Sequence, residues 1–248
     1  YNLDMREEIN KKYLKEKQYK TTQYLEARIK IHQFTKNKVG FHEWIFSQYD
    51  LSEFKKNNDK IKILDVGCGI GNNLNLLINE NFNSYGLDLS YECISYLKEL
   101  YKGKKNKPTL KVGNMKSLPF NNKMFDLIID IFSSYALNKS DGQIFINEVC
   151  RCLKKNGKFF SVFPSKNSDA WKKEGYKKRI DHDTLMGFQR KQSPYFGNNY
   201  PFRFMNKQNY IKLLEKNGFK IDYLEKNMRT YNSMKEKFEF LIIECTKV

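Results

Sequence analysis

The sequence predicts an α/β fold built around a central, mostly parallel sheet. From Ile61 onward, short apolar segments alternate with amphipathic ones, which is typical of strands that are each followed by a helix. The apolar segments are nearly continuous in Ile, Leu, Val and Phe, as expected for strands that are covered on both faces. The length of 248 residues is enough for one large domain with an appendage.

The N-terminal part of the chain has a different pattern. Residues 1–60 interleave apolar side chains with Lys, Glu and Arg, which predicts an N-terminal helical extension or cap. A polar run that ends at Lys60 separates this extension from the predicted main domain, residues 61–248.

The main domain is predicted to contain a seven-stranded sheet with helices on both faces. The expected strands are residues 61–66, 84–89, 109–112, 125–132, 158–163, 219–224 and 238–246, and the expected helices are 74–78, 93–101, 144–153 and 206–217. The last two strands follow each other closely, so we expect them to pair as an antiparallel C-terminal addition. Residues 61–164 would be the core, 165–205 a long insertion of the kind that is usually functional, and 206–248 the C-terminal helix and strand pair.

Composition excludes several classes of protein. No apolar run approaches the roughly 20 residues that a membrane span requires, so no membrane partner is expected. The opening segment has neither the basic start nor the apolar stretch of a secretory signal. The 5 cysteines lack the paired spacing of a zinc site or of a disulfide framework. We therefore expect a cytoplasmic protein with reduced thiols and no metal, as a monomer or a homodimer.

The net charge of +17 raises the question of a nucleic-acid partner, since cations that neutralise phosphates supply sequence-independent affinity. The excess is nearly all lysine, and it is spread along the chain rather than gathered in one stripe. The lysine-rich run 102–107 is explained by a solvated loop. Nucleic acid is therefore the second choice of partner, behind a small molecule.

The segment Val66-Gly67-Cys68-Gly69-Ile70-Gly71 lies at a predicted turn between a strand and a helix. Glycines there allow unusual backbone angles and a close approach of a ligand to the backbone, beside the exposed first N–H groups of the helix. Asp88 ends the next predicted strand, where a carboxylate can accept both hydroxyls of a ribose. Position 72 is not the glycine that a dinucleotide fingerprint requires. The pattern therefore favours a nucleoside ligand without a pyrophosphate.

The sequence from Leu64 to Gly71 resembles the signature motif of class I S-adenosylmethionine-dependent methyltransferases. The resemblance covers residues 61–164 and continues through Tyr85–Ser90, Gly113–Phe120, Phe125–Asp130 and Glu148–Lys158. It implies a Rossmann-like fold with S-adenosyl-L-methionine as cofactor and S-adenosyl-L-homocysteine as product. It also implies direct in-line transfer of the methyl group, which needs no metal because the sulfonium already makes the methyl electrophilic.

The same resemblance implies which residues contact the cofactor. Asp65, Gly67 and Gly69, with Cys68 between the glycines, would surround the methionine part. Asp88 would hold the ribose, and Leu89 would lie against the adenine.

Further contacts would come from later segments and from the N-terminal extension. Asn114, where many relatives have aspartate, and Met115 would address the adenine edge. Asp130 and Ile131 would lie near the cofactor's ammonium group; for Asp130 the alternative is a buried carboxylate satisfied by N–H groups. Tyr19 and Trp44 would close over the cofactor.

The acceptor is expected to bind to the N-terminal extension and to the segments after the fourth and fifth strands. The substrate-binding candidates are Tyr135, Tyr195, Tyr200 and Arg203, with ordinary packing as the alternative for the tyrosines. His182, flanked by two aspartates, is the candidate general base, with a surface loop histidine as the alternative.

The layout after Pro164 is similar to that of small-molecule methyltransferases, which favours a metabolite acceptor attacked through oxygen or nitrogen. The alternatives are an RNA or other nucleic-acid methyltransferase, a non-catalytic scaffold with the cofactor fold, and a nicotinamide-dependent oxidoreductase. The intact glycines and Asp88 disfavour a scaffold, and position 72 disfavours the oxidoreductase.

Overall fold

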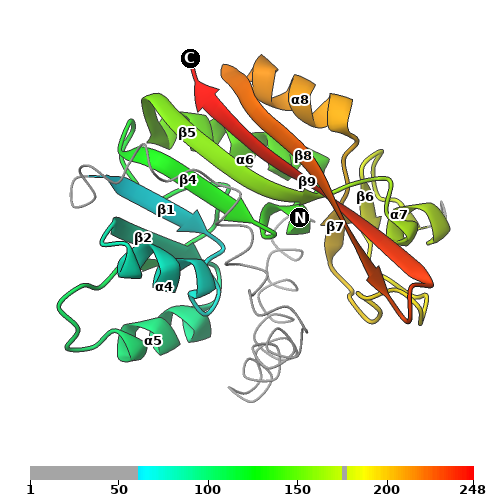
Figure 1. Cartoon of the computed structure of the whole chain (residues 1–248), viewed down its shortest axis with the longest axis horizontal. Coiled ribbons are helices and arrows are strands. Elements are labelled where there is room, and N and C mark those ends of the chain that lie inside the picture. The colour runs from blue at the N-terminus through cyan, green and yellow to red at the C-terminus, as the bar shows by residue number, and fades with distance from the viewer. Residues whose placement is uncertain (1–60, 175–177) are drawn as a thin grey trace, which may run out of the picture.

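The computed structural model of the chain describes residues 61–174 and 178–248 (Figure 1). Its centre is a seven-stranded sheet in the order β3-β2-β1-β4-β5-β9-β8. The first five strands in this order pair in parallel, and β9 is antiparallel to both of its neighbours. The prediction of a mostly parallel sheet with an antiparallel C-terminal strand is confirmed. The strands are β1 (Lys62–Val66), β2 (Asn83–Asp88), β3 (Thr109–Val112), β4 (Phe125–Ile131), β5 (Leu153–Pro164), β8 (Phe219–Tyr231) and β9 (Glu236–Lys247).

Helices cover both faces of this sheet. On one face α4 (Asn72–Asn79) and α5 (Tyr91–Leu100) pack against β2 and β3, and on the other α6 (Lys139–Cys152) and α8 (Lys207–Lys216) pack against β5 and β8 (Figure 1). The side chains of Ser90, Asn138 and Asn206 accept a backbone N–H at the start of α5, α6 and α8, which explains where these helices begin. None of the helices in residues 61–174 and 178–248 has the length and hydropathy that a transmembrane span needs.

The core follows the apolar strands. Leu64, Leu127, Ile128, Phe159 and Ile242 are completely buried in one large cluster that joins β1, β4, β5 and β9. Such strands are buried on both faces, which is why their sequences are apolar without alternation. A smaller cluster between α4 and α5 contains Cys68, Leu74, Ile94, Leu97 and Tyr101.

The strand pair at the C-terminal end is longer than predicted. The apolar pattern predicts that the first strand ends at residue 224, but β8 continues to Tyr231, which pairs with Glu236 of β9. Because β8 lies at the edge of the sheet, much of it is solvent-exposed and its side chains are mostly polar. The run of apolar side chains therefore ends several residues before the backbone hydrogen bonding between β8 and β9 does.

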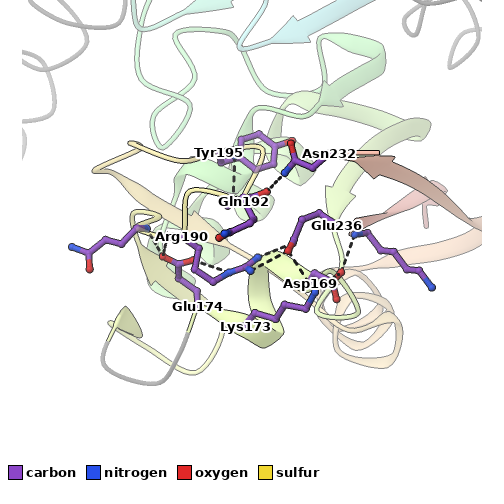
Figure 2. A network of polar contacts seen from close by, with 11 residues as sticks. Asp169, Lys173, Glu174, Arg190, Gln192, Tyr195, Asn232 and Glu236 are labelled. Carbon is purple, nitrogen blue, oxygen red and sulfur yellow. Dashed lines mark hydrogen bonds and ion pairs between the residues drawn. The ribbon is translucent and has the colours of Figure 1, made fainter. Parts of the chain in front are cut away.

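The insertion between β5 and α8 contains a short helix, α7 (Asp169–Lys173), and a separate two-stranded sheet of β6 (Thr184–Met186) and β7 (Pro201–Arg203). Ion pairs join this insertion to the turn between β8 and β9 (Figure 2). Glu236 is 3% exposed, and its two oxygens accept from Nη1 and Nη2 of Arg190 at 3.0 and 2.6 Å. Nearby, Asn232 Nδ2 donates to the carbonyl oxygen of Gln192. The insertion is therefore fixed to the β8–β9 hairpin rather than being a loose loop.

Candidate functional site

The glycine-rich segment forms a tight turn between β1 and α4. Gly67, Gly69 and Gly71 have φ angles of 71°, 53° and 85°, in the left-handed region that favours glycine. The backbone N–H groups of Gly67 and Cys68 donate to the carbonyl oxygen of Leu87 at 2.7 and 3.0 Å, which ties this turn to the end of β2. A side chain at position 69 would meet no atom within 4 Å, so the backbone is open there.

The start of α4 is the second feature of this turn. Its N-cap is Gly71, with no side-chain cap and no acidic residue in the first turn. Helices leave their first N–H groups without intrahelical partners, so these donors point toward the glycine turn. Partial positive charge at this helix end favours a negatively charged or electron-rich ligand group.

Asp88, at the end of β2, faces the same turn. Its Oδ2 accepts from the Gly69 N–H at 2.8 Å and its Oδ1 accepts from the Ser90 N–H at 2.8 Å. Each oxygen keeps further acceptor capacity, as a ribose diol would require. Burial raises the pKa of Asp88, and the backbone hydrogen bonds from Ser90 and Gly69 oppose this shift. The N–H of Gly113 donates to the Asp88 carbonyl oxygen at 2.9 Å and so brings the loop after β3 to the same place.

Asp65, near the end of β1, is an incompletely satisfied carboxylate. It is 1% exposed, and its Oδ1 accepts from Asn73 Nδ2 at 3.2 Å. Its Oδ2 is buried and has no hydrogen-bond partner among residues 61–174 and 178–248. Burial raises the pKa of Asp65 to about 7, the Asn73 hydrogen bond opposes this, and the charges of Asp88 and Asp130 add to it. A buried oxygen without a donor is costly, and a cationic ligand group would remove that cost.

Comparison with known proteins agrees with this geometry. Residues 63–157 match a family model described as a methyltransferase domain. This match covers less than half of the chain, from β1 to the first part of β5. A solved SAM-dependent methyltransferase of Methanosarcina mazei superposes on it with a TM-score of 0.67 and 19% identity, covering 81% of this chain and 98% of that one. Because the identity is below 25%, this similarity shows a shared fold.

Two curated relatives are more similar in sequence over part of this chain. An uncharacterized protein of Methanocaldococcus jannaschii is 41% identical over 97 residues, which are 39% of this chain and 34% of that protein. An uncharacterized methyltransferase of Anoxybacillus flavithermus is 29% identical over 96 residues, which are 39% of this chain and 43% of that protein. The match therefore spans less than half of either relative and is confined to part of this chain.

The fold brings most of the predicted cofactor residues to one end of β1, β2 and β3. Leu89 is 37% exposed beside Asp88, as a surface for a flat ring requires. Asn114 uses its Oδ1 to accept from the Lys116 N–H at 3.0 Å, so this oxygen already helps to form the local turn. Met115 is half-buried against the main core.

Two other predicted cofactor residues point into the protein. The Cys68 side chain is 5% exposed and packs in the cluster between α4 and α5, so it is the backbone of this residue that faces the turn. Ile131 is 7% exposed and belongs to the main core. Tyr19 and Trp44 lie outside the described residues.

Asp130, the residue predicted to lie near the cofactor's ammonium group, makes its hydrogen bonds within the protein. Asp130 is completely buried, and its oxygens accept from Ser133 Oγ at 2.6 Å, the Ser134 N–H at 2.9 Å, Ser161 Oγ at 3.3 Å and the Ser134 hydroxyl. The serines after β4 therefore satisfy the carboxylate, and the alternative of an internally satisfied aspartate is the one that the contacts support. Its role is to hold the turn after β4.

The tyrosines predicted to bind substrate pack in the aromatic core of the insertion. Tyr135 and Tyr200 are 9% and 7% exposed, and their hydroxyl oxygens are 3.5 Å apart. Tyr195 packs against Phe202 and Phe238, with ring centroids 4.8 and 5.0 Å away. Ordinary packing is thus what the structure shows for these rings, because the insertion needs its own core.

The other two predicted acceptor-side residues have different surroundings. The His182 side chain is 70% exposed, and its Nδ1 lies 2.8 Å from Asp183 Oδ1. Arg203 is 2% exposed and lines a cavity between α6 and α8.

Two residues of the site were missed by sequence reasoning. Asn73 donates to Asp65, and its position just after the last glycine of the turn was the available signal. Ser133 Oγ donates to the Val66 carbonyl oxygen at 2.6 Å, and its Cβ occupies the space of a side chain at Gly67. Ser133 reaches the turn from the end of β4, the parallel neighbour of β1, and its position just after that strand was the available signal.

Proposed function

We propose that this chain is an S-adenosylmethionine-dependent methyltransferase that acts on an oxygen or nitrogen atom of a small-molecule acceptor. The main support is the open glycine turn at Gly69, with Asp88 beside it. The second support is Oδ2 of Asp65, which has no hydrogen-bond partner within the residues that the structure describes. Bound S-adenosylmethionine would supply an electrophilic methyl group for direct in-line displacement.

The residues at the turn fit the three chemical parts of this cofactor. Asp88 has acceptor capacity for the ribose hydroxyls, and the exposed Leu89 offers an apolar surface to the adenine. Asp65 Oδ2 would accept from the positively charged amino group of the methionine part. In an ionised form, Asp65 would thereby gain a partner for the oxygen that has none in the described part of the chain.

The same proposal assigns a different role to each segment of the chain. Residues 61–164 would bind the cofactor, and residues 165–205 would face the acceptor together with the extension 1–60. Residues 206–248 would complete the sheet. Methyl transfer depends chiefly on alignment of acceptor atom, methyl carbon and sulfur, so we expect these segments to act by positioning and by exclusion of water.

Calorimetric titration with S-adenosylmethionine and S-adenosylhomocysteine, with NAD as a control, tests the cofactor assignment. We expect binding of the first two ligands alone, weakened about tenfold or more in Asp88→Ala, because charged hydrogen bonds to the ribose are lost. Asp222→Ala, which removes an exposed carboxylate from β8, is the matched control and should bind as the wild type does. Unchanged affinity in Asp88→Ala would contradict the assignment.

His182 is proposed as the general base for acceptors that must lose a proton. His182→Ala should then lower kcat by roughly 10²-fold or more while leaving the calorimetric affinity for S-adenosylmethionine unchanged. The turnover of an acceptor pool is measured as release of S-adenosylhomocysteine. Equal kcat values for the two proteins would remove His182 from the mechanism.

A nucleic-acid acceptor is the second candidate, because the net charge of +17 favours polyanions. It predicts that RNA binds with an affinity that falls steeply as salt is raised, and that RNA stimulates release of S-adenosylhomocysteine. Stimulation by small metabolites alone would favour the first candidate.

A further inference from the structure

A cavity lies on the face of the sheet opposite to α4 and α5. This cavity of about 960 Å³ is bounded by α6, α8 and the insertion, and no residue of the glycine turn lines it. Cavities of this volume commonly bind small molecules. The feature that sets this cavity apart is an arginine in its wall.

Arg203, the last residue of β7, places its guanidinium in a closely fitted position. The guanidinium carbon, Cζ, lies 4.9 Å from the centre of the Phe163 ring, which covers one side of the guanidinium. A side-chain carbon at Gly142 of α6 would lie 1.5 Å from Nη1, so the guanidinium fills the space that the missing side chain leaves. Phe163, Gly142 and Arg203 come from three separate segments that together fix the position of one cation.

This cation has no hydrogen-bonding partner within residues 61–174 and 178–248. Arg203 is 2% exposed, its Nε is buried with no acceptor, and only longer-range charges, those of Asp130, Asp181 and Asp183 among them, favour its charged form. Burial lowers the pKa of Arg203, but a guanidinium remains charged at neutral pH. Buried charges are normally paired because desolvation is costly, so an unpaired buried arginine at a cavity indicates a ligand anion.

The surrounding charges favour an anion as well. The cavity is also lined by the ammonium groups of Lys139, Lys212 and Lys216, which are exposed to solvent. The two carboxylates in the lining already accept hydrogen bonds: Asp181 accepts from the N–H groups of Lys139 and Asp183 at 2.9 and 2.7 Å, and Asp183 accepts from Lys166 Nζ. The cations in the wall therefore outnumber the carboxylates.

We propose that this cavity binds the carboxylate or phosphate group of a small molecule, with Arg203 as the central anion-binding residue. A guanidinium offers a planar fork of donors that matches both groups, and the lysines around it add positive potential. The site is separate from the proposed cofactor site, and its occupancy does not require the chain to transfer methyl groups.

Thermal melting of the purified full chain tests this site without any cofactor. Sodium phosphate and sodium malonate are titrated separately, against sodium chloride at equal ionic strength. We expect the melting temperature to rise and saturate with phosphate or malonate but not with chloride, because a ligand that binds the folded state stabilises it. The anion that raises the melting temperature more identifies the bound group as a phosphate or a carboxylate.

Three variants separate the site from general charge effects. Arg203→Met should weaken the anion affinity roughly ten- to hundredfold, and its melting temperature without anion should stay the same or rise, because an unpaired buried charge is removed. Gly142→Ala keeps the charge but displaces the guanidinium, and should weaken binding too. Lys226→Gln removes one positive charge from the exposed part of β8 and should bind anions as the wild type does.

A measurement on the wild type alone complements these variants. The Nε–H resonance of Arg203 in a ¹⁵N-correlated NMR spectrum should shift on addition of the stabilising anion. Absence of stabilisation by both anions, equal stabilisation of the wild type and Gly142→Ala, or an unshifted Nε–H resonance would each overturn the proposal.

Discussion

Asp65→Asn should make the protein alone more stable, and increasingly so as the pH rises. The pKa of Asp65 is raised from 3.8 to about 7, chiefly because the carboxyl is buried. Below pH 3.8 the group is protonated in both the folded and the unfolded chain, and it contributes no difference. Between these two pKa values the unfolded chain releases the proton and the folded chain does not, so the free energy of unfolding falls with pH until the folded pKa is passed.

The size of the effect follows from the difference of about 3 pKa units, which corresponds to about 4 kcal/mol when the folded carboxyl is fully ionised. Asparagine has no charge to desolvate. Between about pH 5 and pH 8, the free energy of unfolding of Asp65→Asn minus that of the wild type should therefore grow by about 3 kcal/mol.

Urea unfolding at a series of pH values measures this difference, and subtraction removes the titration of every group that the two proteins share. Asp222→Asn, which makes the same change on the exposed part of β8, is the control for loss of a surface carboxylate. A flat difference for Asp65→Asn, or a variant less stable than the wild type at pH 8, would refute the argument that Asp65 is a desolvated, incompletely paired carboxyl.

Two further predictions concern packing and buried charge. Arg190→Met should remove both guanidinium donors from Glu236, which is 3% exposed, and lower the free energy of unfolding by about 3–5 kcal/mol. Urea titrations measure this loss, and a loss below about 1 kcal/mol would mean that Lys173 suffices for this carboxylate. Gly86→Ala should lower the free energy of unfolding by about 1–3 kcal/mol, because the new Cβ would lie 2.8 Å from Leu74 Cδ1 and 2.9 Å from Leu110 Cδ2. Scanning calorimetry measures this loss, and an unchanged melting temperature would show that both leucines can move.

The central strands could be predicted from sequence because burial and backbone pairing coincide there. β1 and β4 are covered on both faces, so their apolar runs end where the ladder ends. The same reasoning placed the end of β8 at residue 224, too early, because an edge strand can remain paired while its side chains are polar. The hydropathy of a segment indicates whether its side chains are buried. It indicates whether its backbone is paired in a sheet only where the paired residues are also buried.

The candidate site divides in the same way. The meeting of the glycine turn with Asp88 depends on two consecutive strand ends and is visible as a local motif. The pairing state of a buried group depends on residues elsewhere in the chain. Asp130 is satisfied by serines from the turn after β4 and from β5. Arg203, between Phe163 and Gly142, has no hydrogen-bond partner for its Nε among residues 61–174 and 178–248. Sequence patterns identify charged residues, but they do not show which of them lack partners.

The position of β9 has a consequence for synthesis of the chain on the ribosome. β9 is translated after the other strands of this sheet, yet it lies inside the sheet, between β5 and β8. Until residues 236–247 have emerged, β5 has an open edge along apolar residues such as Phe159 and Phe163, and β8 has no strand to join. Exposed apolar edges pair readily with other chains, so a nascent or truncated chain that stops before Glu236 would be prone to aggregate while its glycine turn is already complete.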